Sequence, residues 1–168
     1  MNNTKSLIIY FSRADENYFD GKTKDLDKGN TEIVAEYIKD ITDSDIFKVE
    51  PLVEYSKEYT KCISEAKERI KAHDAPIKSN ISDISSYDTI YIGTPVYWGK
   101  MPEELVTALK VLNFEGKTIR PFITHEGSGE AEIPAQIKEI CQGANVLDSL
   151  VLVGSTVKSS KPIVENWI

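Results

Sequence analysis

The sequence predicts an α/β fold in which a parallel sheet is covered by helices on both faces. Its 168 residues, 40 % of them hydrophobic, suit one domain with a sizeable core. Short apolar runs alternate with stretches of helical period, and the alternation repeats along the whole chain. Such alternation is typical of parallel sheets, because parallel strands need crossover helices between them. We therefore expect residues 1–168 to form one domain.

The predicted strands are short runs rich in β-branched and aromatic residues, bounded by polar or turn residues. They span residues 6–12, 45–49, 87–94, 117–124 and 146–154. The predicted helices carry their apolar residues on one stripe. They span residues 31–41, 57–72, 102–112 and 132–141, with a short terminal helix at 162–168. The third helix starts with Pro102 followed by Glu103 and Glu104, as a helix N-terminus prefers.

The chain is acidic, with 27 Asp and Glu against 20 Lys and Arg and a net charge of −7. Binding to nucleic acid or to an anionic membrane is disfavoured, since both need a concentrated basic face. An acidic surface is equally compatible with plain solvation and with attraction of a basic partner protein.

The first apolar run, Leu7 to Phe11, is too short for a signal-peptide core or a membrane span. Cys62 and Cys141 lie in separate helical patterns with no CxxC spacing, which favours buried thiols over a disulfide. These features predict a cytoplasmic protein. They leave its assembly open between a monomer and a homodimer.

Chemistry is expected in the loops that follow the strands, because open parallel sheets bind ligands beyond the carboxyl ends of their strands. After the first strand, Ser12 and Thr31 offer hydroxyls, Asn30 offers an amide, and the new helix offers free backbone N–H groups. Together these donors suit a phosphate. Alternatively, Asn30 merely caps the helix. The phosphate-loop patterns GxxxxGK[ST] and GxGxxG are both absent.

The loop after the third strand contains the adjacent aromatics Tyr97 and Trp98 between Pro95 and Gly99. Such side chains gain by stacking on a flat ring, and glycine permits close approach of the backbone to its edge. The alternative is that these aromatics only cover the sheet edge. A phosphate beside a flat ring describes a mononucleotide with an extended aromatic ring, and flavin mononucleotide (FMN) fits better than a dinucleotide.

The loop after the fourth strand, "THEGSG", offers flexible backbone and amide donors at residues 127–129. His125 could donate a hydrogen bond to a ring or to a substrate, or could simply be solvated. The residues show neither a Ser/His/Asp arrangement nor metal-ligand spacing, so we predict no catalytic residue of the chain's own and no metal.

The order of a strand, "GNT" at a helix start, "GTPVYWGKMP" and "THEGSG" resembles the flavodoxin-like family over essentially the whole chain. The resemblance implies a three-layer sandwich whose five parallel strands have the order 2-1-3-4-5. It also implies a phosphate held by the first loop and an isoalloxazine ring held between the other two. The implied cofactor-binding residues are Ser12, Arg13, Asn30, Thr31, Thr94, Pro95, Val96, Tyr97, Trp98, Gly99, Thr124, His125, Gly127, Ser128 and Gly129.

The sequence departs from the family pattern at residues 14–28, a mostly polar insertion that splits a usually compact phosphate loop and puts the role of Arg13 in doubt. The insertion contains Tyr18 and Phe19 among charged residues. It could be a disordered excursion, a lid over the flavin or a loop that docks a partner.

Three functions are compatible with these features. The first is electron transfer between protein partners by an FMN-binding flavodoxin. The second is an FMN-dependent oxidoreductase that passes electrons from a nicotinamide to a quinone or another small acceptor, since residues 93–102 also resemble the matching loop of flavodoxin-like quinone reductases. The third is a flavin-free binding domain on the same fold.

Overall fold

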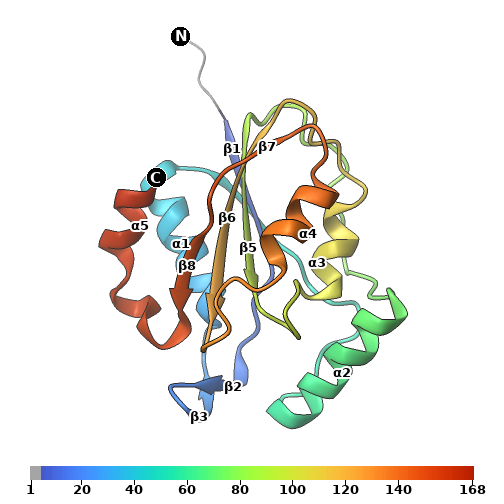
Figure 1. The fold of residues 1–168 in the computed structure, drawn as a ribbon, viewed down its shortest axis with the longest axis vertical. Helices are drawn as coiled ribbons and strands as arrows, with labels where there is room; N and C mark the ends of the chain where they lie inside the picture. The colour runs from blue at the N-terminus through green and yellow to red at the C-terminus, as the bar shows by residue number, and fades with distance from the viewer. Residues whose placement is uncertain (1–4) are drawn as a thin grey trace.

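A central parallel sheet organises the computed structural model, which describes residues 5–168 (Figure 1). Its strands are β1 (Ser6–Tyr10), β4 (Asp45–Lys48), β5 (Thr89–Pro95), β6 (Thr118–His125), β7 (Asn145–Val146) and β8 (Leu150–Val153). They are ordered β4-β1-β5-β6-β7, and β8 also pairs with β6. This is the predicted order 2-1-3-4-5, except that two short segments share the fifth position.

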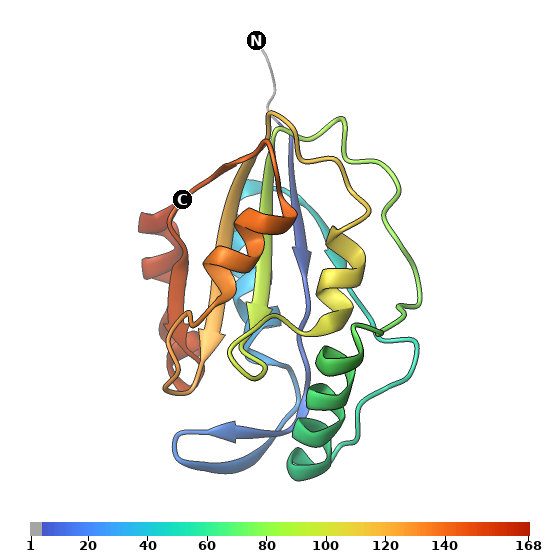
Figure 2. The ribbon, with the colours of Figure 1, turned by 45° about the vertical axis from the view of Figure 1, so that its right-hand side comes forward.

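Helices cover both faces of the sheet, as predicted (Figures 1 and 2). One face carries α1 (Asn30–Thr42), a 3₁₀ helix η1 (Gly154–Ser159) and α5 (Lys161–Trp167). The other carries α2 (Tyr59–Ala72), α3 (Glu103–Leu109) and α4 (Ile133–Ile140). Successive side chains of β1 point to opposite faces of the sheet, so the strand contributes to both core clusters. Ile8 packs in the cluster with α1 and α5, whereas Ile9 packs in the cluster with α3 and α4.

The predicted fifth strand, residues 146–154, is interrupted. Ile119 of β6 pairs with Val146, and Phe122 pairs with Leu150. Between these two pairs, the segment from β7 to β8 therefore contains one residue more than β6 does. An extra residue in one strand breaks the ladder locally. The chain then leaves the sheet at Gly154, where η1 begins.

The insertion forms a β-hairpin, which corrects the interpretation of residues 14–28 as a disordered excursion. Strand β2 (Asp15–Phe19) pairs antiparallel with β3 (Lys22–Leu26). The two turn residues, Asp20 (φ 50°) and Gly21 (φ 84°), both have positive φ, as a type I′ hairpin turn requires. The hairpin lies at the carboxyl end of the sheet near the start of α2 (Figure 2).

Gly93 in β5 has no room for a side chain, because a Cβ there would lie 2.1 Å from Cζ of the fully buried Phe122. Gly93→Ala should therefore lower the free energy of unfolding by about 1–3 kcal/mol through overpacking. Urea unfolding measures the loss. The double variant Gly93→Ala/Phe122→Leu should recover part of it, and a Gly93→Ala protein as stable as wild type would contradict this packing.

Candidate functional site

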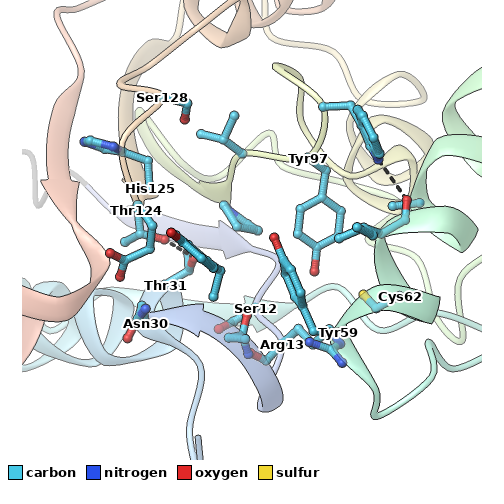
Figure 3. A pocket seen from close by; sticks show the side chains of 18 residues that line it. Ser12, Arg13, Asn30, Thr31, Tyr59, Cys62, Tyr97, Thr124, His125 and Ser128 are labelled. Carbon is cyan, nitrogen blue, oxygen red and sulfur yellow. Dashed lines mark hydrogen bonds between the residues drawn. The ribbon is translucent and has the colours of Figure 1, made fainter. Parts of the chain in front are cut away.

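A pocket of about 360 Å³ opens at the carboxyl edge of the sheet, within the size range of small-molecule sites (Figure 3). It draws on the hairpin, the start of α1, α2 and the loops after β5 and β6. Its lining residues are Ser12, Arg13, Asn17, Tyr18, Asn30, Thr31, Tyr59, Cys62, Ile63, Ala66, Pro95, Val96, Tyr97, Trp98, Thr124, His125, Glu126 and Ser128. Most of the predicted cofactor-binding residues are thus brought together.

The start of α1 meets the end of β1 at Ser12. Gly29 is the N-cap, and the Ser12 Oγ atom accepts a hydrogen bond of 3.1 Å from the backbone N–H of Glu32. A Cβ at Gly29 would lie 2.1 Å from that Oγ atom, so glycine permits this close approach. Ser12 therefore caps the helix, and Asn30 is its first residue rather than its cap. The Ser12 hydroxyl proton remains free for an acceptor in the pocket.

Thr31 and Thr124 join α1 to β6 through a hydrogen bond of 2.7 Å between their hydroxyls. Both residues are buried. Only one of the two hydroxyls can donate in this bond, so the proton of the other remains available to a ligand.

Arg13 lines the pocket, but its guanidinium is used by the hairpin. It donates to the backbone carbonyls of Glu16 (2.5 Å), Ser56 (2.7 Å) and Lys57 (3.0 Å). These bonds fix the base of the hairpin to the segment before α2. In this arrangement Arg13 supports the wall of the pocket. Its predicted contact with a phosphate stays a prediction.

The loop after β5 turns tightly at Trp98 and Gly99. Tyr97 and Lys100 exchange two backbone hydrogen bonds, and Trp98 (φ 54°) and Gly99 (φ 78°) both have positive φ. Gly99 therefore serves a type I′ turn. The close approach of its backbone to a flat ring stays a prediction. The Trp98 Nε1–H donates to the carbonyl of Ile63 at 2.8 Å and leaves 54 % of the residue exposed.

Tyr97 plays a different part from its neighbour. Its ring packs edge-on against Phe11 (5.7 Å between centroids) and Tyr55 (5.9 Å). Burial raises the pKa of the Tyr97 phenol well above its ordinary value. The predicted aromatic pair thus divides into Trp98, an exposed platform at the rim, and Tyr97, which supports the floor.

The loop after β6 is folded around His125. Its Nδ1 atom accepts hydrogen bonds from the backbone N–H groups of Gly127 (2.9 Å) and Gly129 (3.1 Å). These two amides therefore do not face the pocket as predicted. Because Nδ1 accepts, the proton of a neutral imidazole lies on Nε2, where it can be donated.

Four predicted residues are missing from the lining that the described chain provides: Thr94, Gly99, Gly127 and Gly129. Thr94 is fully buried and donates to the carbonyl of Pro95 at 2.7 Å. The other three are turn residues with positive φ. These three glycines shape the loops around the pocket.

Seven lining residues lie outside the predicted cofactor-binding set: Asn17, Tyr18, Tyr59, Cys62, Ile63, Ala66 and Glu126. The first two come from the hairpin, whose Asp20-Gly21 dipeptide is a strong two-residue turn signal. The α2 residues could not be placed, because nothing in a helical stripe says which end approaches the pocket. Glu126 lies between two residues that were selected.

Comparison with known proteins assigns the fold to a family. The family model described as "Flavodoxin" matches residues 25–168. The chain belongs to the flavodoxin family. The matched region begins within β3, so it excludes most of the hairpin of this flavodoxin-family protein. No curated protein matches it at a significant level.

Several solved structures share the fold of this flavodoxin-family protein. A Bacteroides uniformis protein described as a flavoprotein has a TM-score of 0.74 at 22 % identity, covering 98 % of this chain and 97 % of its own. A Lactobacillus acidophilus flavoprotein in complex with FMN has a TM-score of 0.62 at 22 % identity, covering 93 % of this chain and 97 % of its own. Two-electron reduced Megasphaera elsdenii flavodoxin has a TM-score of 0.56 at 19 % identity, covering 95 % of this chain and 96 % of its own.

Residues 5–168 contain neither a membrane-spanning helix nor a metal-binding cluster. None of their helices is long and apolar enough to cross a membrane. The same residues hold no group of three or more His, Cys, Asp or Glu side chains that could bind a metal ion.

Proposed function

We propose that this protein binds FMN in the pocket and carries electrons between protein partners. The observation that carries the proposal is one pocket with two chemically different sides. Asn30, Thr31 and His125 lie on one side, whereas Tyr97, Tyr59 and Cys62 lie on the other (Figure 3). A flavin mononucleotide has the same division into an anionic phosphate and a flat apolar ring.

The residues present fit that cofactor. The N-terminus of α1 and the free proton of Ser12 suit a phosphate, because a helix N-terminus combines N–H donors with a partial positive charge. The side chain of Trp98, which lines the pocket and is about half exposed, suits the ring. The FMN complex of the Lactobacillus acidophilus flavoprotein, which shares the fold, supports the same choice. When bound, FMN would supply the redox chemistry, and the chain would bind and orient it.

The net charge of −7 favours electron transfer with proteins. Negative charge attracts basic partners and disfavours the anionic reduced form of a flavin. The second candidate is an NAD(P)H-dependent reductase of quinones or similar small acceptors, favoured by the likeness of residues 93–102 to the loop of such reductases.

The proposal is tested by adding FMN to the purified protein and then supplying electrons. FMN fluorescence should be quenched at a one-to-one ratio. The loaded protein should pass electrons from a flavin reductase to cytochrome c and consume little NADH or NADPH with a quinone alone. Rapid NAD(P)H-dependent quinone reduction would favour the second candidate, and failure to bind FMN would exclude both.

Trp98→Ala should weaken the binding of FMN and of riboflavin by the same amount, about 0.5–1.5 kcal/mol, because the lost contact is with the ring that the two ligands share. Fluorescence titration measures both affinities. Trp98→Phe is the matched control, since it keeps an aromatic face but loses the bond to Ile63. A loss confined to FMN would place Trp98 near the phosphate instead.

A further inference from the structure

We propose that the β2–β3 hairpin is a wall of the flavin site and that Tyr18 contacts the isoalloxazine ring. This inference rests on the proposed function and adds to it a contact from the insertion. Asn17 and Tyr18, both from β2, line the same pocket as Ser12 and Trp98. The family model matches only from residue 25, so these two residues lie outside the matched region.

The base of the hairpin is fixed to α2 by several bonds. Beside the three bonds of Arg13, the Glu16 carboxylate accepts a hydrogen bond of 3.0 Å from the backbone N–H of Tyr59, the first residue of α2. A carboxylate at a helix N-terminus is favoured by the helix dipole. The backbone N–H of Glu16 also donates to the carbonyl of Lys57 at 3.2 Å. The position of β2 relative to α2 is thus specified by Arg13, which precedes the insertion, and by Glu16 within it.

The tip of the hairpin reaches the opposite side of the pocket. The backbone N–H of Asp20, in the turn, donates to Oε2 of Glu126 at 3.3 Å. Glu126 follows His125, the last residue of β6. The hairpin is therefore held at its base by α2 and at its tip by the loop after β6. An element fixed at both ends of the pocket is suited to be a wall.

Tyr18 is placed to present its ring to a ligand. It stacks on Tyr59, with ring centroids 6.2 Å apart and an interplanar angle of 29°, yet 42 % of Tyr18 remains exposed. Both residues line the pocket. An exposed aromatic side chain on a fixed support gains by covering a flat ring, at little cost in ordering. A ring contact predicts equal losses for ligands with and without a phosphate.

The experiment titrates the full chain with lumiflavin, which is the ring alone, and with riboflavin and FMN. Tyr18→Ala should lower the affinity for all three by a common factor of about three to ten. Tyr18→Phe should stay within about twofold of wild type, because the ring is kept. The matched control is Phe19→Ala: Phe19 is on the same strand but outside the pocket lining of residues 5–168, under the ammonium of Lys24 (4.7 Å). It should bind all three ligands as wild type does.

Hydrogen exchange of the hairpin amides separates a lost contact from a lost hairpin. Should Tyr18→Ala open the hairpin, Tyr18→Leu keeps an apolar contact with Tyr59 and should show the same common loss with normal protection. Unchanged affinities in a protected Ala or Leu variant would overturn the inference, as would an equal loss in Phe19→Ala. Wild-type protein that binds none of the three flavins would instead overturn the proposed function.

Discussion

Arg69→Met is expected to lower the free energy of unfolding by about 3–5 kcal/mol, because it strips a buried carboxylate of its charged partner. Glu104 is fully buried in α3. Its side chain accepts hydrogen bonds from Nη1 of Arg69 at 2.6 Å and from the hydroxyl of Tyr55 at 2.8 Å. The guanidinium also lies over the Tyr55 ring, 3.8 Å from its centroid. Methionine can replace the packing of the arginine stem but not its charge.

The double variant Arg69→Met/Glu104→Gln should recover much of that loss, since no buried charge is then left unpaired. Lys28→Met is the matched exposed control. Lys28 pairs with Glu36 at 2.7 Å, but both side chains are nearly half exposed, so Lys28→Met should lower the stability far less than Arg69→Met does. Urea unfolding compares the three variants. An Arg69→Met loss no larger than that of Lys28→Met would show that Glu104 is not held as an unpaired charge in the variant.

The sheet and its layers could be predicted from the sequence because their cause is local. The runs around Ile8 and Ile90 are short and mostly apolar, which is the pattern of a strand buried on both faces. The hairpin was not predicted because its strands are mostly polar and show no apolar alternation. Its order comes instead from Arg13 and Glu16, which bind backbone groups far along the chain. Such long-range contacts leave no period in the sequence.

The residues of the candidate site likewise fall into those that a local pattern could place and those that depend on distant contacts. Ser12 and Asn30 could be placed because the ends of parallel strands and the starts of their helices meet at one edge. The direction of a loop amide could not be predicted, and His125 turns the amides of Gly127 and Gly129 toward itself. Likewise, no sequence pattern distinguishes an exposed Trp98 from a supporting Tyr97. That difference depends on Phe11 and Tyr55, which pack against Tyr97 from elsewhere in the fold.

FMN is expected to bind at least tenfold more tightly than riboflavin, and Ser12→Ala should remove much of that preference. Hydrogen bonds to a charged group contribute about 1.5–3 kcal/mol each. The Ser12 Oγ atom accepts from Glu32 N–H and so keeps its proton for the phosphate. Loss of the Ser12 hydroxyl should weaken the binding of FMN by that amount and barely affect the binding of riboflavin. Because the hydroxyl also caps α1, its loss should lower the free energy of unfolding by about 1 kcal/mol. Paired fluorescence titrations measure both affinities.

Glu126→Gln should act in the opposite direction and is the sharper half of the test. The Glu126 Oε1 atom is buried without a hydrogen-bond partner among the described residues. It and the Nδ2 atom of Asn30 lie 2.6 and 2.4 Å from the point where a Cβ at Gly154 would stand, so the carboxylate is close to the start of α1. A carboxylate there repels a phosphate, and its neutralisation should tighten FMN severalfold while leaving riboflavin unchanged. If Ser12→Ala and Glu126→Gln instead shift both ligands equally, the phosphate does not lie at the start of α1.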